Sequence, residues 1–159
     1  MADPPLPQSE YYQPIAHTMS TITTEQQAAI AALLKDMHIP VGMGTVDRAC
    51  SIAAINLALS GKLTDRIPDC MSPAIGGWII NIQDAMPDSM RNSTEWKKLL
   101  PLAAGTGRDY ERERVEIIVD WMWGTVLPVL QPQAERLGFG AEWHRMCIER
   151  TAAAAKSSH

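Results

Sequence analysis

The fold of this chain is decided by residues 45–78, which read TVDRACSIAAINLALSGKLTDRIPDCMSPAIGGW. Within them, ACSIAAINLAL at 49–59 is apolar almost all round a helix, which is typical of a helix buried in a protein core. The run is shorter than the roughly 20 apolar residues that span a bilayer. Thr45 is the expected N-cap, and Gly61 suits the left-handed position that ends many helices. The pattern therefore predicts a core helix of an all-α protein.

A second helix is expected to follow a polar turn at 62–72. Ser72 before Pro73 combines a helix cap with a proline at the first helical position, so we predict a helix over 73–86. Its apolar residues recur at spacings of three and four and share one face. Gly76 and Gly77 cost helix propensity, about 1 kcal/mol each relative to alanine. Close approach of the helix over 49–58 would explain them.

Periodicity and capping signals predict further helices, and no stretch alternates as a convincing strand. The expected ranges are 23–37, 92–100, 109–127, 132–137 and 141–156. Pro101 is expected to begin a separate turn. In 109–127 we expect a buried stripe of Val115, Ile118, Val119, Met122 and Val126. The sequence thus predicts a single-domain, all-α bundle of five to seven helices over residues 21–156.

Composition narrows the classes of function. The chain has 159 residues and a net charge of −4, which argues against a large nucleic-acid footprint, because such a footprint needs a basic face. Residues 1–20 are proline-rich and are expected to form a disordered or extended leader. They show no secretory signal, and no membrane span is expected. Three cysteines without an export signal predict free thiols in a cytoplasmic protein.

The polar turn offers one candidate reactive or metal site, formed by Cys50, Asp65, Asp69 and Cys70. A thiol beside a helix N-terminus can have a lowered pKa and act as a nucleophile, and two aspartates can serve as acid and base. The commoner interpretation is a packed cysteine pair with aspartates that stabilise a turn. Close ligand pairs such as Cys-x-x-Cys are missing, so neither a metal site nor a cofactor is predicted.

The second candidate is a partner-binding surface on the helix over 109–127. Trp121 and Trp123 lie two residues apart and point to different helix faces, so one is expected in the core and the other at the surface. Exposed tryptophans are enriched at binding hot spots. The remaining candidates in this surface are Arg108, Arg112 and Arg114. A charged first turn that leads into a buried helix is the alternative interpretation.

Residues 48–125 resemble a group of small uncharacterised bacterial helical proteins, and the match is of moderate specificity. It includes Cys50, Asp65, PDC at 68–70, PAI at 73–75, QDAMPD at 83–88 and LLPL at 99–102. The resemblance implies a helical fold and a bacterial or phage origin. It assigns no activity and no catalytic residue.

These observations favour a non-catalytic helical protein that binds another protein in a regulatory or inhibitory role. Catalytic and metal motifs are missing, whereas methionine- and tryptophan-rich helices are present. A homo-oligomer is compatible with the same features. The alternative is a small enzyme or metal-binding protein that uses the turn at 50–70.

Overall fold

The fold is described from a computed structural model, which describes residues 22–150; the expected leader at 1–20 lies outside this range. The described chain is mostly helical, as predicted, with one two-stranded hairpin. In order, the elements are α1 (Thr24–Asp36), β1 (Gly44–Thr45), β2 (Arg48–Ala49), α2 (Ser51–Ser60), α3 (Pro73–Ala85), α4 (Asp88–Arg91), α5 (Thr94–Ala104), α6 (Glu111–Trp121), a π-helical turn (Met122–Val126), α7 (Leu127–Val129), α8 (Gln131–Arg136) and α9 (Gly140–Glu149). None of the helices in the described range is long and apolar enough to cross a membrane.

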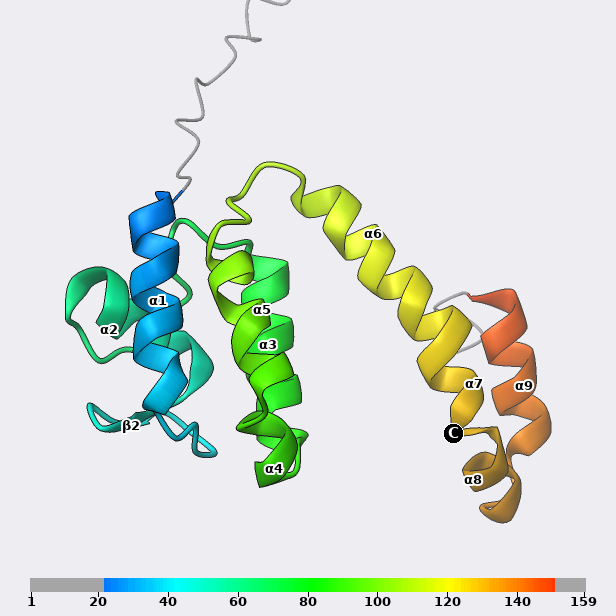
Figure 1. The fold of residues 1–159 in the computed structure, drawn as a ribbon. Coiled ribbons are helices and arrows are strands. Elements are labelled where there is room, and N and C mark those ends of the chain that lie inside the picture. Colours follow the sequence, from blue (N-terminus) through cyan, green and yellow to red (C-terminus); the bar gives the residue numbers. More distant parts are fainter. Residues whose placement is uncertain (1–21, 151–159) are drawn as a thin grey trace, which may run out of the picture.

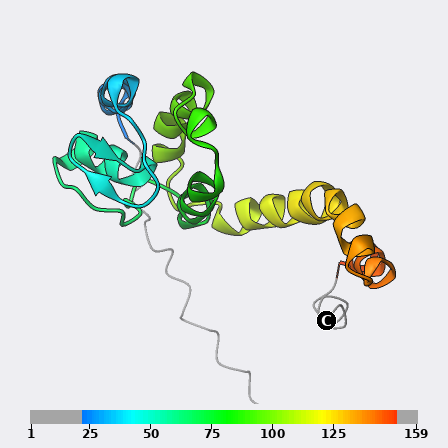
Figure 2. The ribbon, with the colours of Figure 1, turned by 90° about the horizontal axis from the view of Figure 1, so that it is seen from below.

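The helices of residues 22–150 fall into two groups (Figure 1). Helices α1–α5 pack together around α2, and we call residues 22–107 the body. Helix α6 leaves the body at one end, and the π-helical turn and α7 continue it; α8 and α9 then fold back beside it (Figures 1 and 2). We call residues 111–150 the arm. The described residues hold more helical segments than the five to seven predicted, because α4, α7 and α8 are short pieces.

Helix α2 is the centre of the body, as its sequence predicts. Ile52 and Ile55 are completely buried, and α1, α3 and α5 pack around them. The helix ends at Gly61 in the left-handed conformation (φ 70°), as expected. Its expected N-cap was wrong: Cys50 caps it, with Sγ accepting from the Ala53 N–H. Thr45 lies instead in the antiparallel hairpin of β1 and β2, which the sequence analysis missed.

Buried polar side chains tie the loops of the body to its helices. Asn56 donates from its amide to the carbonyls of Thr64 and Arg66, both at 2.8 Å, and so shapes the polar turn. Arg91 donates to the carbonyls of Ile39 and Met86 at 2.9 and 2.7 Å. Because the guanidinium is almost fully buried, these bonds replace the water that it loses.

The predicted start of α3 is confirmed. Ser72 caps the helix by accepting from the Ile75 N–H at 3.2 Å, and Pro73 follows. Gly76 does allow close approach, but the neighbour is Ile67 of the polar turn rather than α2: a Cβ at Gly76 would lie 2.7 Å from the Ile67 side chain. Helix α5 also differs from expectation, because it begins after the Ser93 cap and runs through Pro101 to Ala104 without a break.

The structure of the arm differs most from what the sequence predicts. Each residue of α6 stays at least partly exposed, so the expected buried stripe is wrong. Val115, Val119 and Met122 are exposed, and Ile118 and Val126 are only half-buried. The amphipathic pattern correctly indicates a helix, but α3 is the body helix against which α6 packs, and it covers little of that face. The arm therefore carries an apolar face that no described segment buries.

Candidate functional site

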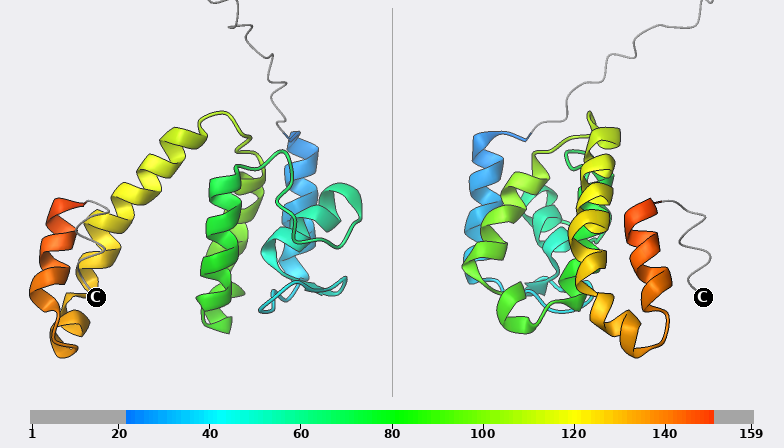
Figure 3. Two further views of the ribbon diagram at one scale, coloured as in Figure 1. Left: turned by 180° about the vertical axis from the view of Figure 1, so that it is seen from behind. Right: turned by 90° about the vertical axis from the view of Figure 1, so that its right-hand side faces the viewer.

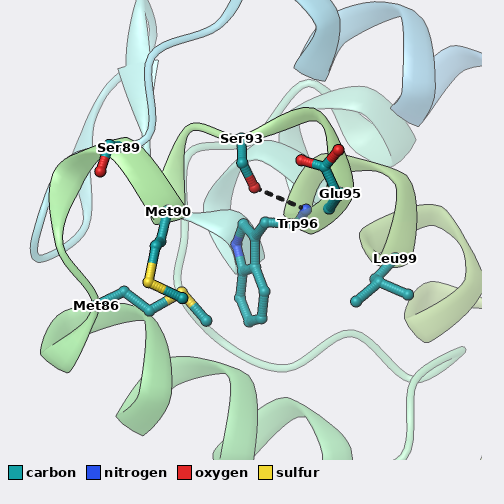
Figure 4. Close-up of a pocket in the computed structure, with 7 residues that line it drawn as sticks. All are labelled: Met86, Ser89, Met90, Ser93, Glu95, Trp96 and Leu99. Atoms are coloured by element: carbon teal, nitrogen blue, oxygen red, sulfur yellow. Dashed lines mark hydrogen bonds between the residues drawn. The ribbon is translucent and has the colours of Figure 1, made fainter.

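An apolar groove lies on the body where α3, α4 and α5 meet. Its larger part is a cavity of about 440 Å³ lined by Met86, Ser89, Met90, Ser93, Glu95, Trp96 and Leu99. In Figure 4 the side chains of Met86 and Met90 lie beside the indole of Trp96. Methionine is flexible and polarisable, and it makes favourable contacts with aromatic rings. This end of the groove can therefore adapt its shape to an apolar side chain.

Trp96 forms the floor of the groove, and its position is fixed from two sides. Its backbone N–H donates to the Ser93 hydroxyl at 3.2 Å, which caps α5. Its indole N–H donates to the Ser51 hydroxyl at 3.1 Å, at the start of α2. The polar atom of the ring is thus satisfied inside the core, and the apolar ring edge is left for the groove.

A second cavity of about 260 Å³ continues the groove along α3 and α5. It shares Trp96 and Leu99 with the first cavity. The other lining residues are Ile75, Trp78, Ile79, Leu100, Leu102, Ala103 and Thr106. Leu99 and Leu102 form the rim and are 55 % and 63 % exposed. We call these two adjoining cavities together the α3–α5 groove.

The groove ends at the junction with the arm. Trp78, which lines the groove, meets Trp121 of α6 edge to face, with ring centroids 6.1 Å apart. Five apolar residues of α6 and the next turn lie on the side of the helix that carries Trp121. At 3.6 residues per turn they occupy less than half of its circumference: Val115, Ile118, Val119, Trp121 and Met122. We call these five residues the α6 face.

Hydrogen bonds hold the first turn of α6, which we call the root of the arm, on the body. The Glu111 carboxylate accepts from the Ala74 N–H at 3.0 Å, so it adds an anion at the N-terminus of α3. Arg114 donates to the carbonyls of Thr106 and Gly107. Burial raises the pKa of Glu111, but hydrogen bonds from Ser72, Ala74 and Arg114 outweigh it and hold the pKa below its usual value.

The structure assigns different roles to the residues predicted to bind a partner. Arg108 pairs with Asp69 at 3.1 Å, and Arg112 pairs with Glu116 at 2.9 Å on the surface. Arg114 is bonded to the carbonyls of Thr106 and Gly107 at the root of the arm. Trp121 is 46 % exposed and Trp123 is half-buried, so the expectation that one of them lies in the core was wrong. Trp121 alone adjoins the groove.

The candidate reactive site on the polar turn is not assembled. Cys50 is buried as the cap of α2, and Cys70 is buried where its carbonyl accepts from the Gly107 N–H at 2.8 Å. Asp65 is exposed, and Asp69 is exposed in its pair with Arg108. Within residues 22–150, no three histidine, cysteine or acidic side chains are grouped so as to hold a metal ion.

Burial also works against thiol chemistry. It raises the pKa of both Cys50 and Cys70, and nearby aspartates raise it further, although backbone hydrogen bonds act in the opposite direction. A nucleophilic cysteine needs a lowered pKa, because the thiolate is the reactive form. The geometry therefore favours the packing role for both cysteines.

Comparison with known proteins adds no relative: the chain matches no protein-family model, no curated protein and no solved structure. The predicted helix over 92–100 contains Trp96 and Leu99, but nothing in the sequence analysis indicated that Trp78, Met90 and Leu102 are their neighbours. The spacing of Leu99 and Leu102 beside Trp96 was the available signal.

Proposed function

We propose that this chain is a non-catalytic helical protein that acts by binding another protein, in a regulatory or inhibitory role. The observation that carries the proposal is the α3–α5 groove, an apolar cavity whose rim residues Leu99 and Leu102 stay exposed. Exposed apolar surface is costly in water, and contiguous patches mark sites of interaction.

The shape of the groove indicates the kind of partner. Its lining is almost wholly apolar, and it runs between two helices with Trp96 at its floor. Such grooves accept the apolar face of an amphipathic helix, with anchors spaced at three and four residues. The Ser89, Ser93 and Glu95 side chains supply a polar border at one end.

The proposal is tested by capture of partners from a bacterial lysate with the tagged protein. The Leu99→Glu/Leu102→Glu variant places two charges on the rim, at positions exposed enough to leave the fold intact. Ile148→Glu, on α9 and 67 % exposed, is the matched control. We expect a specific protein to be captured by the parent chain and by the control and lost with the rim variant, while circular dichroism stays helical. Equal capture by all three chains would contradict the proposal.

A further inference from the structure

The α3–α5 groove and the α6 face present similar apolar chemistry on one chain. Both are exposed, both are lined by aliphatic and aromatic side chains, and both adjoin the Trp78–Trp121 contact. We propose that each is the binding site of the other, between two copies of this chain. The inference rests on the proposed function and names its partner as a second copy.

Within one chain the two surfaces meet only where Trp78 contacts Trp121. The root of α6 is held by Glu111 on Ala74 and by Arg114 on two carbonyls. From that root the helix axis diverges from α3 and α5, as the views in Figure 3 show. Because α6, the π-helical turn and α7 form one continuous helix, the α6 face cannot fold back onto the groove without breaking those bonds.

A second copy can reach both surfaces at once. In a two-fold dimer each arm lies along the groove of the other chain, so one contact occurs twice. This is not a domain swap, because the arm does not leave a place that it already fills in its own chain. It covers a groove that its own chain leaves open. Glu95 borders the groove, and on α6 Arg112 is paired with Glu116 at 2.9 Å, so neither surface carries a cluster of one charge sign. No run of like charge therefore opposes the pairing.

The apolar area available is in the range that a dimer needs. The groove contributes the exposed parts of Trp78, Met90, Leu99 and Leu102, and the α6 face contributes those of Val115, Val119, Trp121 and Met122. These residues are 37–63 % exposed, and covering all of their exposed parts would approach the roughly 800 Å² that a standard interface buries on each partner.

The test is the oligomeric state of the full chain by sedimentation equilibrium over about 1 to 100 μM. We expect a reversible dimer. Leu102→Glu on the groove and Val115→Glu on the α6 face should each weaken association at least tenfold, whereas the exposed Ile148→Glu control should leave it unchanged. A dimer that is insensitive to Val115→Glu would overturn the inference, because the arm would then lie outside the interface.

Mixing the two variants gives the sharper result. Leu102→Glu keeps an intact α6 face and Val115→Glu keeps an intact groove, so one complete contact remains in the mixed pair. We expect the mixture to form a heterodimer more tightly than either variant forms a homodimer. A dimer of groove on groove or of arm on arm gives no such gain, and that outcome would overturn the inference.

Failure of the inference can be separated from failure of the proposed function with a fluorescent apolar dye, anilinonaphthalene sulfonate. If the parent chain stays monomeric but binds the dye, and Leu102→Glu abolishes binding, the self-association is overturned and the groove remains a site for another protein. If the parent chain is monomeric and binds no dye, both proposals are overturned.

Discussion

The body and the arm are built from the same kinds of residue, but they use them differently. In the body, α2 and its neighbours bury Ile30, Leu34, Ile52 and Ile55 completely. In the arm, the isoleucines and valines of α6 stay exposed or half-buried, and Met146 is the large apolar side chain that is buried. The comparison teaches that apolar periodicity makes a helix amphipathic, whereas burial depends on whether another surface covers it.

The largest effect should come from truncating the core of the body. Ile55→Ala removes a fully buried side chain and leaves a cavity, so we expect a loss of about 3 kcal/mol in the free energy of unfolding. Ile117→Ala on the arm, at 68 % exposed, should change it by less than about 0.5 kcal/mol. Urea unfolding followed by circular dichroism measures both, and similar losses would remove the distinction between the two regions.

A smaller effect is expected from the buried arginine. Arg91→Ala leaves the Met86 carbonyl without its side-chain donor and the Ile39 carbonyl with the Asn92 amide alone, which should cost about 2 kcal/mol. Arg112→Ala breaks only an exposed pair on the arm and should cost at most about 0.5 kcal/mol. The same urea titration compares them. A loss at Arg112 as large as that at Arg91 would show that the arm depends on its surface pairs.

Acid should loosen the joint between the regions before it unfolds the body. The pKa of Glu111 is lowered in the folded chain, so its stabilisation is fully present above the ordinary glutamate pKa, about 4.3, and is lost as the pH falls through the lowered value. We expect a low-pH change in tryptophan fluorescence as Trp121 leaves Trp78. This step should be missing in Glu111→Gln and in Trp121→Phe. Its persistence in both variants would assign it elsewhere.

The smallest expected effect is on thiol reactivity. Burial raises the pKa of Cys50 and Cys70 in the body and of Cys147 in the arm, but only Cys147 is half-exposed. A disulfide reagent at neutral pH should therefore label Cys147 first, and the Cys147→Ser variant should react slowly. Rapid labelling of Cys70 in that variant would instead favour the reactive-site hypothesis for the polar turn.

Local signals allowed much of the body to be predicted from sequence. Gly61 ends α2 and Ser72 caps α3 because these signals depend on a few neighbouring residues. The Cys50 cap was missed because a thiol is a weak acceptor and a hydroxyl stood nearby at Thr45. Pro101 was expected to break α5, but the helix tolerates the loss of one backbone donor beside a well-packed Leu100.

The candidate site was predicted only in fragments, because it depends on contacts between distant residues. Trp96 and Leu99 lie in a helix that could be predicted, yet Ile75 and Trp78 come near them only because α3 and α5 line the same cavity. The arginines were chosen for their charge, but Arg108 and Arg114 have partners within the chain. Sequence indicates what a side chain can do, and the fold decides which neighbours satisfy it.

The continuous helix from Glu111 to Val129 also makes the arm a mechanical lever. At a rise of 1.5 Å per residue it is about 28 Å long, so a rotation of 10° at its root moves its far end by roughly 5 Å. The fulcrum is the Tyr110 backbone, held in the left-handed conformation (φ 67°) immediately before Glu111. A rotation at the root would therefore carry α8 and α9 through several ångströms, and the Trp78–Trp121 contact is what opposes it.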